Sequence, residues 1–562
     1  MGNADHCTEN KMNMKILTFV KALSFATFLT FSISMNAQSV INFESAPEDW
    51  FHRDIETDKI PGVSTMRAYE LVRDRQPKKP IVVAVIDSGV DIAHEDLREV
   101  VWTNEDEITG NGIDDDGNGY VDDIHGWSFI GGPTGDVHYD NLEFTRVYKS
   151  LLAKYKGKSK EDISKENMEE FEKFQSMKKQ YVKRVEEAEA NMQEMAQVVS
   201  VYEMADKTFA QELGEDYTAE DLADFEPEDP RMGDLKQFVL HIKQNNLEDR
   251  LRGGYEHFQQ SLEYSYDLEF DPRELVGDNY QDKTERHYGN NHITGPAAEH
   301  GTHVAGIIAA QRDNGIGMDG IAGNAQIMVL RAVPMGDERD KDVANAIYYA
   351  VDNGANIINM SFGKSYSPYK EVVDQAVQYA QEKGVLLIHA AGNSSKDNDS
   401  SDNFPNAQFR NSKEMADNWI EVGASTFQDN ESLVASFSNY GRKTVDLFAP
   451  GMDIYSTVPG SEYKNNSGTS MAAPVVAGVA ALVWSYFPEL TADELREVII
   501  DSCVDYRKLK VTKPGSQQQA SGEEGEKTKV ETIKFKKLSK TGGVVNAYHA
   551  MQLAQKVADK KK

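Results

Sequence analysis

The chain has 562 residues, enough for one large core or for two to four domains, and 40% of them are hydrophobic. Its formal net charge of −32 at pH 7 argues against nucleic acid as a partner, because phosphate backbones are bound through Lys and Arg. The charge suits a soluble, secreted protein and a cation site, although a merely solvated acidic surface accounts for most of it.

The first 37 residues are typical of a secretory signal peptide behind a short N-terminal extension. Residues 14–38 carry a Lys-bearing start and an apolar run, and the run ends in the small-residue site Met35-Asn36-Ala37. Lys21 interrupts the apolar stretch, and we expect no later segment long and apolar enough to span a membrane. The sequence therefore predicts a protein that is not integral to the membrane and is exported to the periplasm, the cell surface or the extracellular medium.

The two cysteines, Cys7 and Cys503, exclude an internal disulfide in the mature chain, because the first precedes the apolar run and is lost with it. An exported protein without disulfides needs another source of stability. A large core and bound calcium are the obvious candidates.

Residues 38–139 form the first part of the expected core domain. The stretch "IVVAVIDSG" is a continuous β-branched run, which predicts a strand buried on both faces and ending at Asp87. In open α/β sheets, ligands bind beyond the carboxyl ends of such strands. Asp87 is therefore a candidate site residue.

The acidic stretch "GNGIDDDGNGYVDD" matches the first half of an EF-hand-type calcium loop, including Gly119 for the sharp turn. It lacks the closing Glu, since His125 falls at that place. Oxygen ligands at this spacing suit a structural Ca²⁺ ion, and the alternative is an acidic turn that binds nothing. The candidate ligands are Asp114, Asp116, Asn118, Tyr120 and Asp122.

Residues 140–285 differ in composition from the rest of the chain, with fewer Gly and Pro and more Glu, Lys and Met. They predict an inserted α-helical hairpin or small bundle. Apolar residues recur there at spacings of three and four, with one position, Lys178, off the pattern, as in a coiled-coil seam. The seam comprises Phe171, Phe174, Tyr181, Val185, Ala188, Met192, Met195, Val199 and Tyr202, and a second pattern runs through Leu235, Phe238, Ile242, Leu247 and Leu251. The alternative is a disordered charged linker. A helical insertion would offer a surface for a protein partner or for self-association.

Residues 286–562 alternate short apolar strands with helices, which predicts a mostly parallel sheet covered on both faces. The expected strands are "AQIMVLRAV", "ANIINMSFG" and "VLLIHAAGN"; the helices between them are "DVANAIYYAVDNG" and "YKEVVDQAVQYAQEKG". Residues 508–529 are expected to form a polar surface loop, and a last helix is expected near 546–557.

Polar residues with complementary chemistry stand at the ends of these elements. "EHGTHVAGIIAA" carries His300 and His303, two histidines that could share a metal, act as a general base or simply pack. "SGTSMAAPVVAGVAALV" begins a helix with Ser470, where free N–H groups can receive an oxyanion, and Asn393 follows a buried strand. Ser470 could be a nucleophile and His300 its base. Asp87 could orient the base, and Asn393 could donate to an oxyanion.

At these residues the sequence resembles the subtilisin-like serine peptidases, the S8 family. The blocks "VAVIDSGVDIAHEDL", "HGTHVAGIIAA" and "GTSMAAPVVAGVAAL" match that family's Asp, His and Ser blocks in order. The resemblance implies that Asp87 orients the imidazole of His300, that His300 is general base and then general acid, and that Ser470 is the nucleophile. Asn393 and the Ser470 N–H would form the oxyanion hole, and His303 would be packing.

The resemblance also implies where a substrate binds. Ser361, Phe362 and Gly363 would pair with the peptide backbone by strand addition, and Ala390, Ala391 and Gly392 would line the P1 pocket. The chain departs from compact members of the family in the long helical segment between the Asp and His blocks. Its short stretch before the first core strand leaves little room for the family's usual inhibitory pro-domain.

The expected fold is a subtilisin-like three-layer α/β fold with a helical insertion, and the expected function is a secreted serine endopeptidase that acts on polypeptides through an acyl-enzyme. Three alternatives stay open: a catalytically inert scaffold that binds protein through its helices, a sedolisin-type acid peptidase, and a chaperone or adhesin. The acid-peptidase class uses Glu as base and Asp at the oxyanion position, where this sequence has His300 and Asn393.

Overall fold

The computed structural model describes residues 45–227, 229, 232–516 and 530–561. The expected signal peptide lies outside these residues. The described chain divides into two compact units, one formed by Ile41–Val147 with Asp271–Lys562 and the other by Tyr148–Phe270. The insertion expected at 140–285 therefore extends beyond the second unit at both ends.

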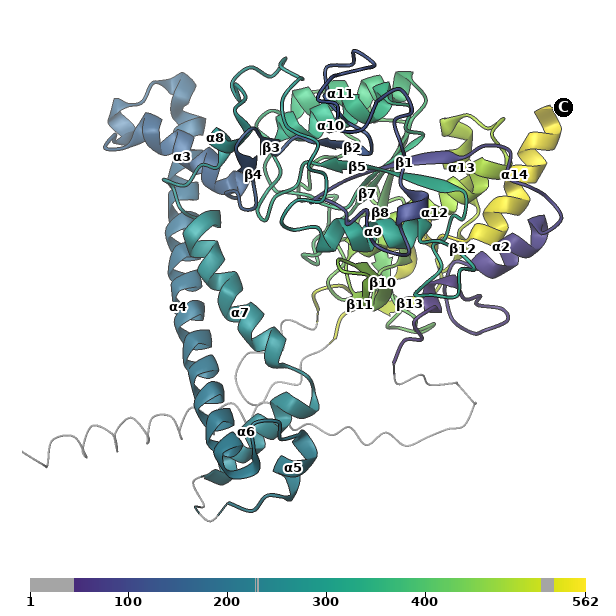
Figure 1. The fold of residues 1–562 in the computed structure, drawn as a ribbon. Helices are drawn as coiled ribbons and strands as arrows, with labels where there is room; N and C mark the ends of the chain where they lie inside the picture. The colour runs from purple at the N-terminus through teal and green to yellow at the C-terminus, as the bar shows by residue number, and fades with distance from the viewer. Residues whose placement is uncertain (1–44, 228, 230–231, 517–529, 562) are drawn as a thin grey trace, which may run out of the picture. The chain divides into compact units, whose positions relative to one another are not determined.

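The first unit is built on a nine-stranded sheet with the order β12-β15-β9-β8-β7-β6-β1-β5-β2 (Figure 1). Each neighbouring pair is parallel except β12 with β15 at one edge. The strands are β1 (Ile81–Asp87), β2 (Gly126–Ser128), β5 (Ala325–Arg331), β6 (Ile357–Met360), β7 (Leu386–Ala390), β8 (Trp419–Ser425), β9 (Leu447–Pro450), β12 (Val504–Asp505) and β15 (Gly543–Val544). The parallel sheet predicted from the apolar runs is confirmed.

Helices cover both faces of this sheet, because its central strands are apolar on both sides. Along β1, Val83 and Val85 pack toward α9 (Glu299–Ala309) and α12 (Thr469–Tyr486). The alternate residues Ala84 and Ile86 belong to the cluster that holds α10 (Asp340–Asp352) and α11 (Lys370–Glu382). The result is the three-layer α/β fold expected from the sequence.

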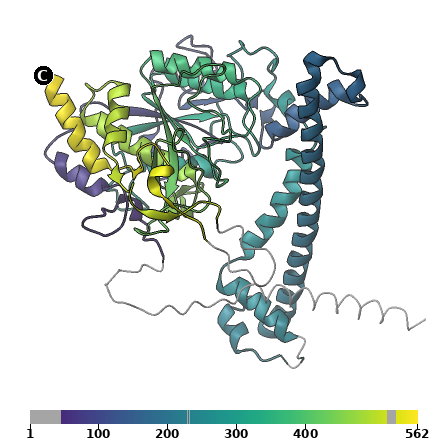
Figure 2. The same cartoon turned by 180° about the vertical axis from the view of Figure 1, so that it is seen from behind.

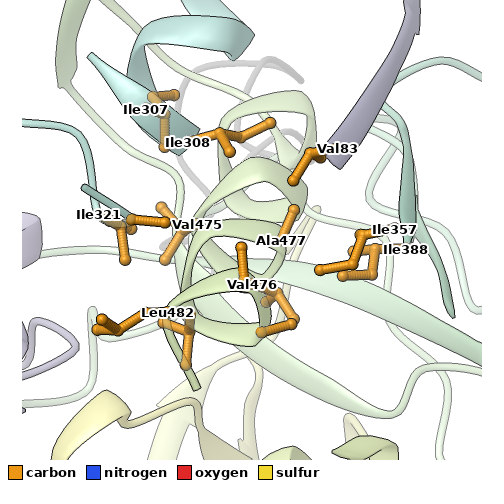
Figure 3. Close-up of a cluster of buried hydrophobic side chains, with 14 of the residues drawn as sticks. Val83, Ile307, Ile308, Ile321, Ile357, Ile388, Val475, Val476, Ala477 and Leu482 are labelled. Carbon is orange, nitrogen blue, oxygen red and sulfur yellow. The ribbon is translucent and has the colours of Figure 1, made fainter. Parts of the chain in front are cut away.

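Helix α12 is the centre of the larger core. Its small and branched side chains meet residues of β1, β6 and β7 on one side and α9 on the other (Figure 3). Contrary to expectation, this helix is long and apolar enough to cross a membrane by length and composition alone. However, 83% of that stretch is buried inside the protein, as in a core helix.

The remaining helices and strands of this unit lie outside the nine-stranded sheet and the helices named above. Helix α14 (Ala547–Lys561) lies beside α2 (Thr65–Val72) (Figure 2), where the Arg67 guanidinium stands 4.1 Å from the ring centre of Tyr548. The other elements are α8 (Arg273–Val276), α13 (Ala492–Asp501) and the two-stranded pairs β3 (Gly131–Gly132) with β4 (Gly135–Asp136), β10 (Ile454–Val458) with β11 (Glu462–Asn466), and β13 (Lys510–Thr512) with β14 (Thr532–Lys534).

The second unit is helical, as predicted. Helix α3 (Glu143–Tyr155) begins in the first unit and runs into the second, where α4 (Met168–Leu213) is 46 residues long. The chain returns through α5 (Ala219–Asp224), α6 (Met232–Gln244) and α7 (Glu248–Gln260). Tyr202 of α4 donates a hydrogen bond of 3.0 Å to Glu248 of α7. The second apolar pattern, expected as one helix, is thus divided between α6 and α7.

The buried side of α4 follows the predicted seam with local differences. Phe171, Phe174, Ala188 and Tyr202 are buried, and most other seam residues are half-buried. Val198 is buried in place of the expected Val199. The apolar stripe therefore drifts around the helix, as a 3.6-residue period must over many turns.

Candidate active site

Asp87 and His300 form a hydrogen-bonded pair at the carboxyl end of the sheet. Asp87 is the last residue of β1, and His300 stands in the first turn of α9. His300 Nδ1 lies 2.7 Å from Asp87 Oδ1, which also accepts the Ser88 N–H at 2.8 Å. Burial opposes a charge on the ring, but the carboxylate of Asp87, with a contribution from Glu299, raises the pKa of His300 above its ordinary value. The pair therefore fixes which ring nitrogen carries the proton and leaves Nε2 as the base.

Ser470 stands in the first turn of α12 and is bonded reciprocally to Ser361. Its Oγ donates to the Ser361 carbonyl at 2.9 Å, and Ser361 Oγ donates to the Ser470 carbonyl at 2.8 Å. Pro474 explains the second bond, because it lacks the N–H that would otherwise reach the carbonyl four residues earlier. Among the described residues, no hydrogen bond joins Ser470 Oγ to His300.

Asn393 presents its amide nitrogen beside Ser470. Its Oδ1 accepts the Thr469 N–H at 2.8 Å and the Thr469 hydroxyl at 2.9 Å, so the side chain has one orientation. A Cβ atom on Gly468 would lie 3.3 Å from Asn393 Nδ2 and 3.5 Å from the Ser470 nitrogen. The Asn393 amide and the Ser470 N–H therefore stand on either side of the space that a side chain at position 468 would enter. Glycine leaves this space free, and two N–H donors around one free space are what an oxyanion requires.

One surface pocket brings the expected catalytic residues together with part of the expected substrate strand. Asp87, His300, Asn393 and Ser470 all line it, as do Ser361 and Phe362. Its other walls include Ala297 to Glu299, Val333 to Met335, and Pro459. Sequence positions spread over more than half of the chain thus meet at a single cleft.

Four of the expected substrate residues do not line this pocket. Gly363 is exposed, whereas Ala390 and Ala391 are buried at the end of β7. The Ala391 carbonyl accepts bonds of 2.9 to 3.1 Å from three asparagine side chains, Asn398, Asn403 and Asn439. These bonds hold the stretch that leads from β7 to Asn393 in place.

Asn403 is a residue that the sequence patterns did not single out. A Cβ atom on Gly363 would lie 2.7 Å from Asn403 Oδ1, and one on Gly392 would lie 3.6 Å from the same oxygen. The Asn403 amide therefore lies between the two glycine segments expected to bind substrate. No local signal marks it, because it comes from an irregular loop just before Pro405.

His303 is a buried packing residue. Its side chain is fully buried, and Nε2 lies 3.0 Å from the Lys464 carbonyl of β11. Because a carbonyl only accepts, Nε2 carries the proton. Burial lowers the pKa of His303 to about 4, so the ring is neutral at pH 7. The two histidines of the opening turn of α9 thus have different environments, and only His300 reaches the cleft.

The acidic loop gathers carboxylates in a different combination from the expected one. Oxygens of Glu107, Asp114 and Asp116 lie within 4.8 Å of one another. Asp122 is not part of this group, and its carboxylate accepts N–H groups of Gly110 and Gly112 at 2.7 and 2.9 Å.

The other two expected ligands also have partners of their own. The amide oxygen of Asn118 accepts the Tyr120 N–H at 2.8 Å, and the Tyr120 ring is buried beside Trp127. Glu107 fell outside the loop pattern because it precedes it. An all-oxygen donor set of three carboxylates fits Ca²⁺.

Asp87, His300, Asn393 and Ser470 thus line one cleft in a domain built on a parallel α/β sheet. Comparison with known proteins shows the family. A profile of the Subtilase family matches residues 78–529, and the chain belongs to this family.

Two relatives and one solved structure illustrate the likeness. The Thermophilic serine proteinase of Bacillus sp. (strain AK1) is 46% identical over 187 residues, which are 33% of this chain and 42% of that protein. Thermitase of Thermoactinomyces vulgaris is 43% identical over 187 residues, which are 33% of this chain and 61% of thermitase. The chain thus matches less than two thirds of either relative. A crystal structure of a cold adapted subtilisin-like serine proteinase aligns with 35% identity and a TM-score of 0.31, covering 37% of this chain and 68% of that one.

Proposed function

We propose that the protein is a serine endopeptidase that hydrolyses peptide bonds of polypeptides through an acyl-enzyme. The observation that carries this proposal is the single cleft lined by Asp87, His300, Ser470 and Asn393. Membership of the Subtilase family supports the same activity.

In the proposed reaction, Ser470 Oγ leaves the Ser361 carbonyl and attacks the substrate carbonyl carbon while Nε2 of His300 takes its proton. Asp87 stabilises the imidazolium through the bond to Nδ1. The oxyanion that develops is bound by Asn393 Nδ2 and the Ser470 N–H. His300 then protonates the leaving amine, and water hydrolyses the acyl-enzyme with His300 again as base.

The peptide would add as a strand beside Ser361, Phe362 and Gly363. Asn403 would contribute the polar floor on the P1 side, between Gly363 and Gly392. The signal-like residues 1–37 support export of the mature chain. The helical unit is proposed to bind a protein partner or to regulate which substrates reach the cleft.

We also propose that Glu107, Asp114 and Asp116 hold a structural Ca²⁺ ion. When bound, the ion would supply positive charge that offsets the repulsion among the three carboxylates. It has no part in the chemical step.

The direct test is labelling with a fluorophosphonate, which reacts with an activated serine, together with peptide hydrolysis. Ser470→Ala should lose labelling and about 10⁶ in kcat, the loss known for subtilisin, a member of the same family. Ser485→Ala is the matched control, since this serine of the same helix is buried and its Oγ donates to the Leu482 carbonyl, away from the cleft residues. Undiminished turnover by Ser470→Ala protein would contradict the assignment. An unlabelled wild-type protein would favour an inert scaffold.

A further inference from the structure

Four consecutive charged residues at the start of α10, Arg339 to Asp342, are almost completely buried. Each one forms an ion pair with another part of the same unit, and Arg339, Lys341 and Asp342 all pair with residues of the stretch 271–285. Arg339 binds Asp140 at 2.7 Å, Asp340 binds Lys364 at 2.8 Å, Lys341 binds Asp278 and Glu285 at 2.6 and 2.7 Å, and Asp342 binds Arg273 at 2.7 Å. The first turn of α10 therefore joins the segments through which the chain leaves and re-enters this unit.

One of these pairs reaches the proposed substrate strand. Lys364 directly follows Ser361, Phe362 and Gly363, and its side chain is 2% exposed. The Nζ atom donates to Glu143 Oε2 at 2.9 Å and to the Glu338 carbonyl at 2.6 Å, and it also pairs with Asp340. An ammonium group this deeply buried needs its carboxylate partners, so their positions determine where Lys364 lies.

Glu143 is the partner of Lys364 that belongs to the departing helix α3, as its first residue. Its carboxylate is 3% exposed and also accepts Arg146 at 2.8 Å. Burial opposes its charge, but Lys364 and Arg146 lower the pKa of Glu143 to about 2. Glu143 is thus charged throughout the neutral range.

A second residue that lines the cleft, Met335, is bonded to the same segment. The Met335 N–H donates to the His138 carbonyl at 2.7 Å, and the Asp140 N–H donates to the Met335 carbonyl at 3.1 Å. Met335 lines the pocket, as do Ser361 and Phe362. Residues 138–143, the stretch that leads into α3, are therefore bonded both to Met335 and, through Glu143, to Lys364 next to the expected substrate segment.

We propose that Glu143 and Lys364 are positioning residues for peptide binding, which hold the segment 361–363, directly after β6, at the spacing that a substrate backbone requires. The inference rests on the proposed peptidase function of the same cleft. Glu143 touches no reacting atom. It acts through Lys364, so loss of its charge lets Phe362 and Gly363 shift, whereas Ser361 stays held by its two hydrogen bonds to Ser470.

A positioning role differs from a merely structural one in its kinetic signature. Strand pairing binds ground state and transition state alike, so its loss raises KM and leaves kcat unchanged. A small acyl ester that reaches only Ser470 makes no strand contacts, and its turnover should not change. Loss of general stability would instead lower the active fraction for both substrates equally.

The test compares Glu143→Gln with Glu285→Gln in the full-length chain. Glu285 is the matched control, because it also binds a buried lysine, Lys341, at 2.7 Å but has no bond to residues 361–364. Each variant is titrated with a fluorophosphonate and assayed with an extended peptide and with the ester. For Glu143→Gln we expect the peptide KM to rise about fivefold or more, roughly the effect of one lost hydrogen bond. Its kcat and ester turnover should stay within about twofold. Glu285→Gln should keep the wild-type KM although it also loses thermal stability.

An unchanged peptide KM in folded Glu143→Gln protein would overturn the inference, as would an equal rise in both variants. If Glu143→Gln does not fold, Glu143→Asp keeps the charge but shortens the side chain. It should raise the peptide KM to a smaller degree, again with unchanged kcat and ester turnover. A wild-type protein that neither reacts with the fluorophosphonate nor turns over the ester would refute the proposed function itself, and this inference with it.

Discussion

The Nδ1 atom of His300 lies 2.7 Å from Oδ1 of Asp87, although 213 positions separate the two residues in the chain. The helical unit occupies most of this interval, yet both residues belong to the other unit. Asp87 is 2% exposed, so its charge acts on the imidazole with little screening by water. The pair can thus control the protonation of His300.

Activity should rise with pH as His300 loses its proton. Because Asp87 raises the pKa of His300, the midpoint of kcat/KM against pH is expected above the unperturbed value of about 6.5. In Asp87→Asn the midpoint should move down and kcat should fall. A protein active only below about pH 4 would contradict the role of His300.

The Asp87–His300 pair should also make stability depend on pH: stability should fall with rising pH, whereas activity should rise. A histidine whose pKa is raised by folding stabilises the native state fully below its unfolded pKa, and this contribution is lost as pH rises through the folded pKa. Melting temperatures of wild-type and His300→Ala protein should therefore converge as the pH increases through the range in which activity appears.

Asn393→Ala should lower kcat by about 10²–10³ with little change in KM, the loss established for subtilisin when this kind of donor is removed. The reason is that Asn393 Nδ2 faces the point next to Gly468 where an oxyanion would lie. Steady-state kinetics on protein titrated for active serine measures the effect. An unaltered kcat would mean that another group donates to the oxyanion.

Gly468→Ala tests the same position by filling it. The backbone at Gly468 is extended, so alanine introduces no backbone strain there. Its methyl group would stand 3.3 Å from Asn393 Nδ2 and 3.5 Å from the Ser470 nitrogen, in the place of the oxyanion. We expect at least about a tenfold loss of kcat, equivalent to roughly 1.4 kcal/mol of transition-state stabilisation, with an almost unchanged melting temperature. Full activity would show that the oxyanion lies elsewhere.

Much of this site could be predicted from sequence because most of its residues stand at the ends of elements that short stretches of sequence predict. A β-branched run predicts β1 and places Asp87 at its end, and runs of small residues predict the close-packed helices α9 and α12. The reciprocal bonds between Ser361 and Ser470 could not be predicted, because they depend on how β6 approaches α12. Asn403 was missed because it stands in an irregular loop, and Glu107 because it precedes the acidic loop pattern.

His303→Gln should reduce stability more than activity. The glutamine amide can still donate to the Lys464 carbonyl, but it fills the buried space less well than the ring, which predicts a loss of about 1–3 kcal/mol. kcat should stay within about twofold because His303 does not line the cleft. A loss of kcat as large as that of His300→Ala, in folded protein, would contradict the packing role.

The low pKa of His303, about 4, also has a consequence for acid stability. In the unfolded chain this histidine binds a proton at about pH 6.5, so the native state loses stability as pH falls from there toward 4. His303→Gln should remove this part of the acid sensitivity. His52, whose pKa burial also lowers to about 4, should retain its own part.

Removal of calcium should lower the melting temperature, if Glu107, Asp114 and Asp116 hold the ion as proposed. Ligand linkage contributes about 2.7 kcal/mol when free Ca²⁺ is a hundredfold above Kd. Glu107→Gln should abolish the difference between melting curves with calcium and with chelator. Asp122→Asn is the control within the same loop: its carboxylate caps the N–H groups of Gly110 and Gly112, so this change should lower the melting temperature but preserve the response to calcium. The proposed site would be refuted by equal melting temperatures of the wild-type protein in calcium and in chelator. A calcium response that survives in Glu107→Gln would place the ion elsewhere.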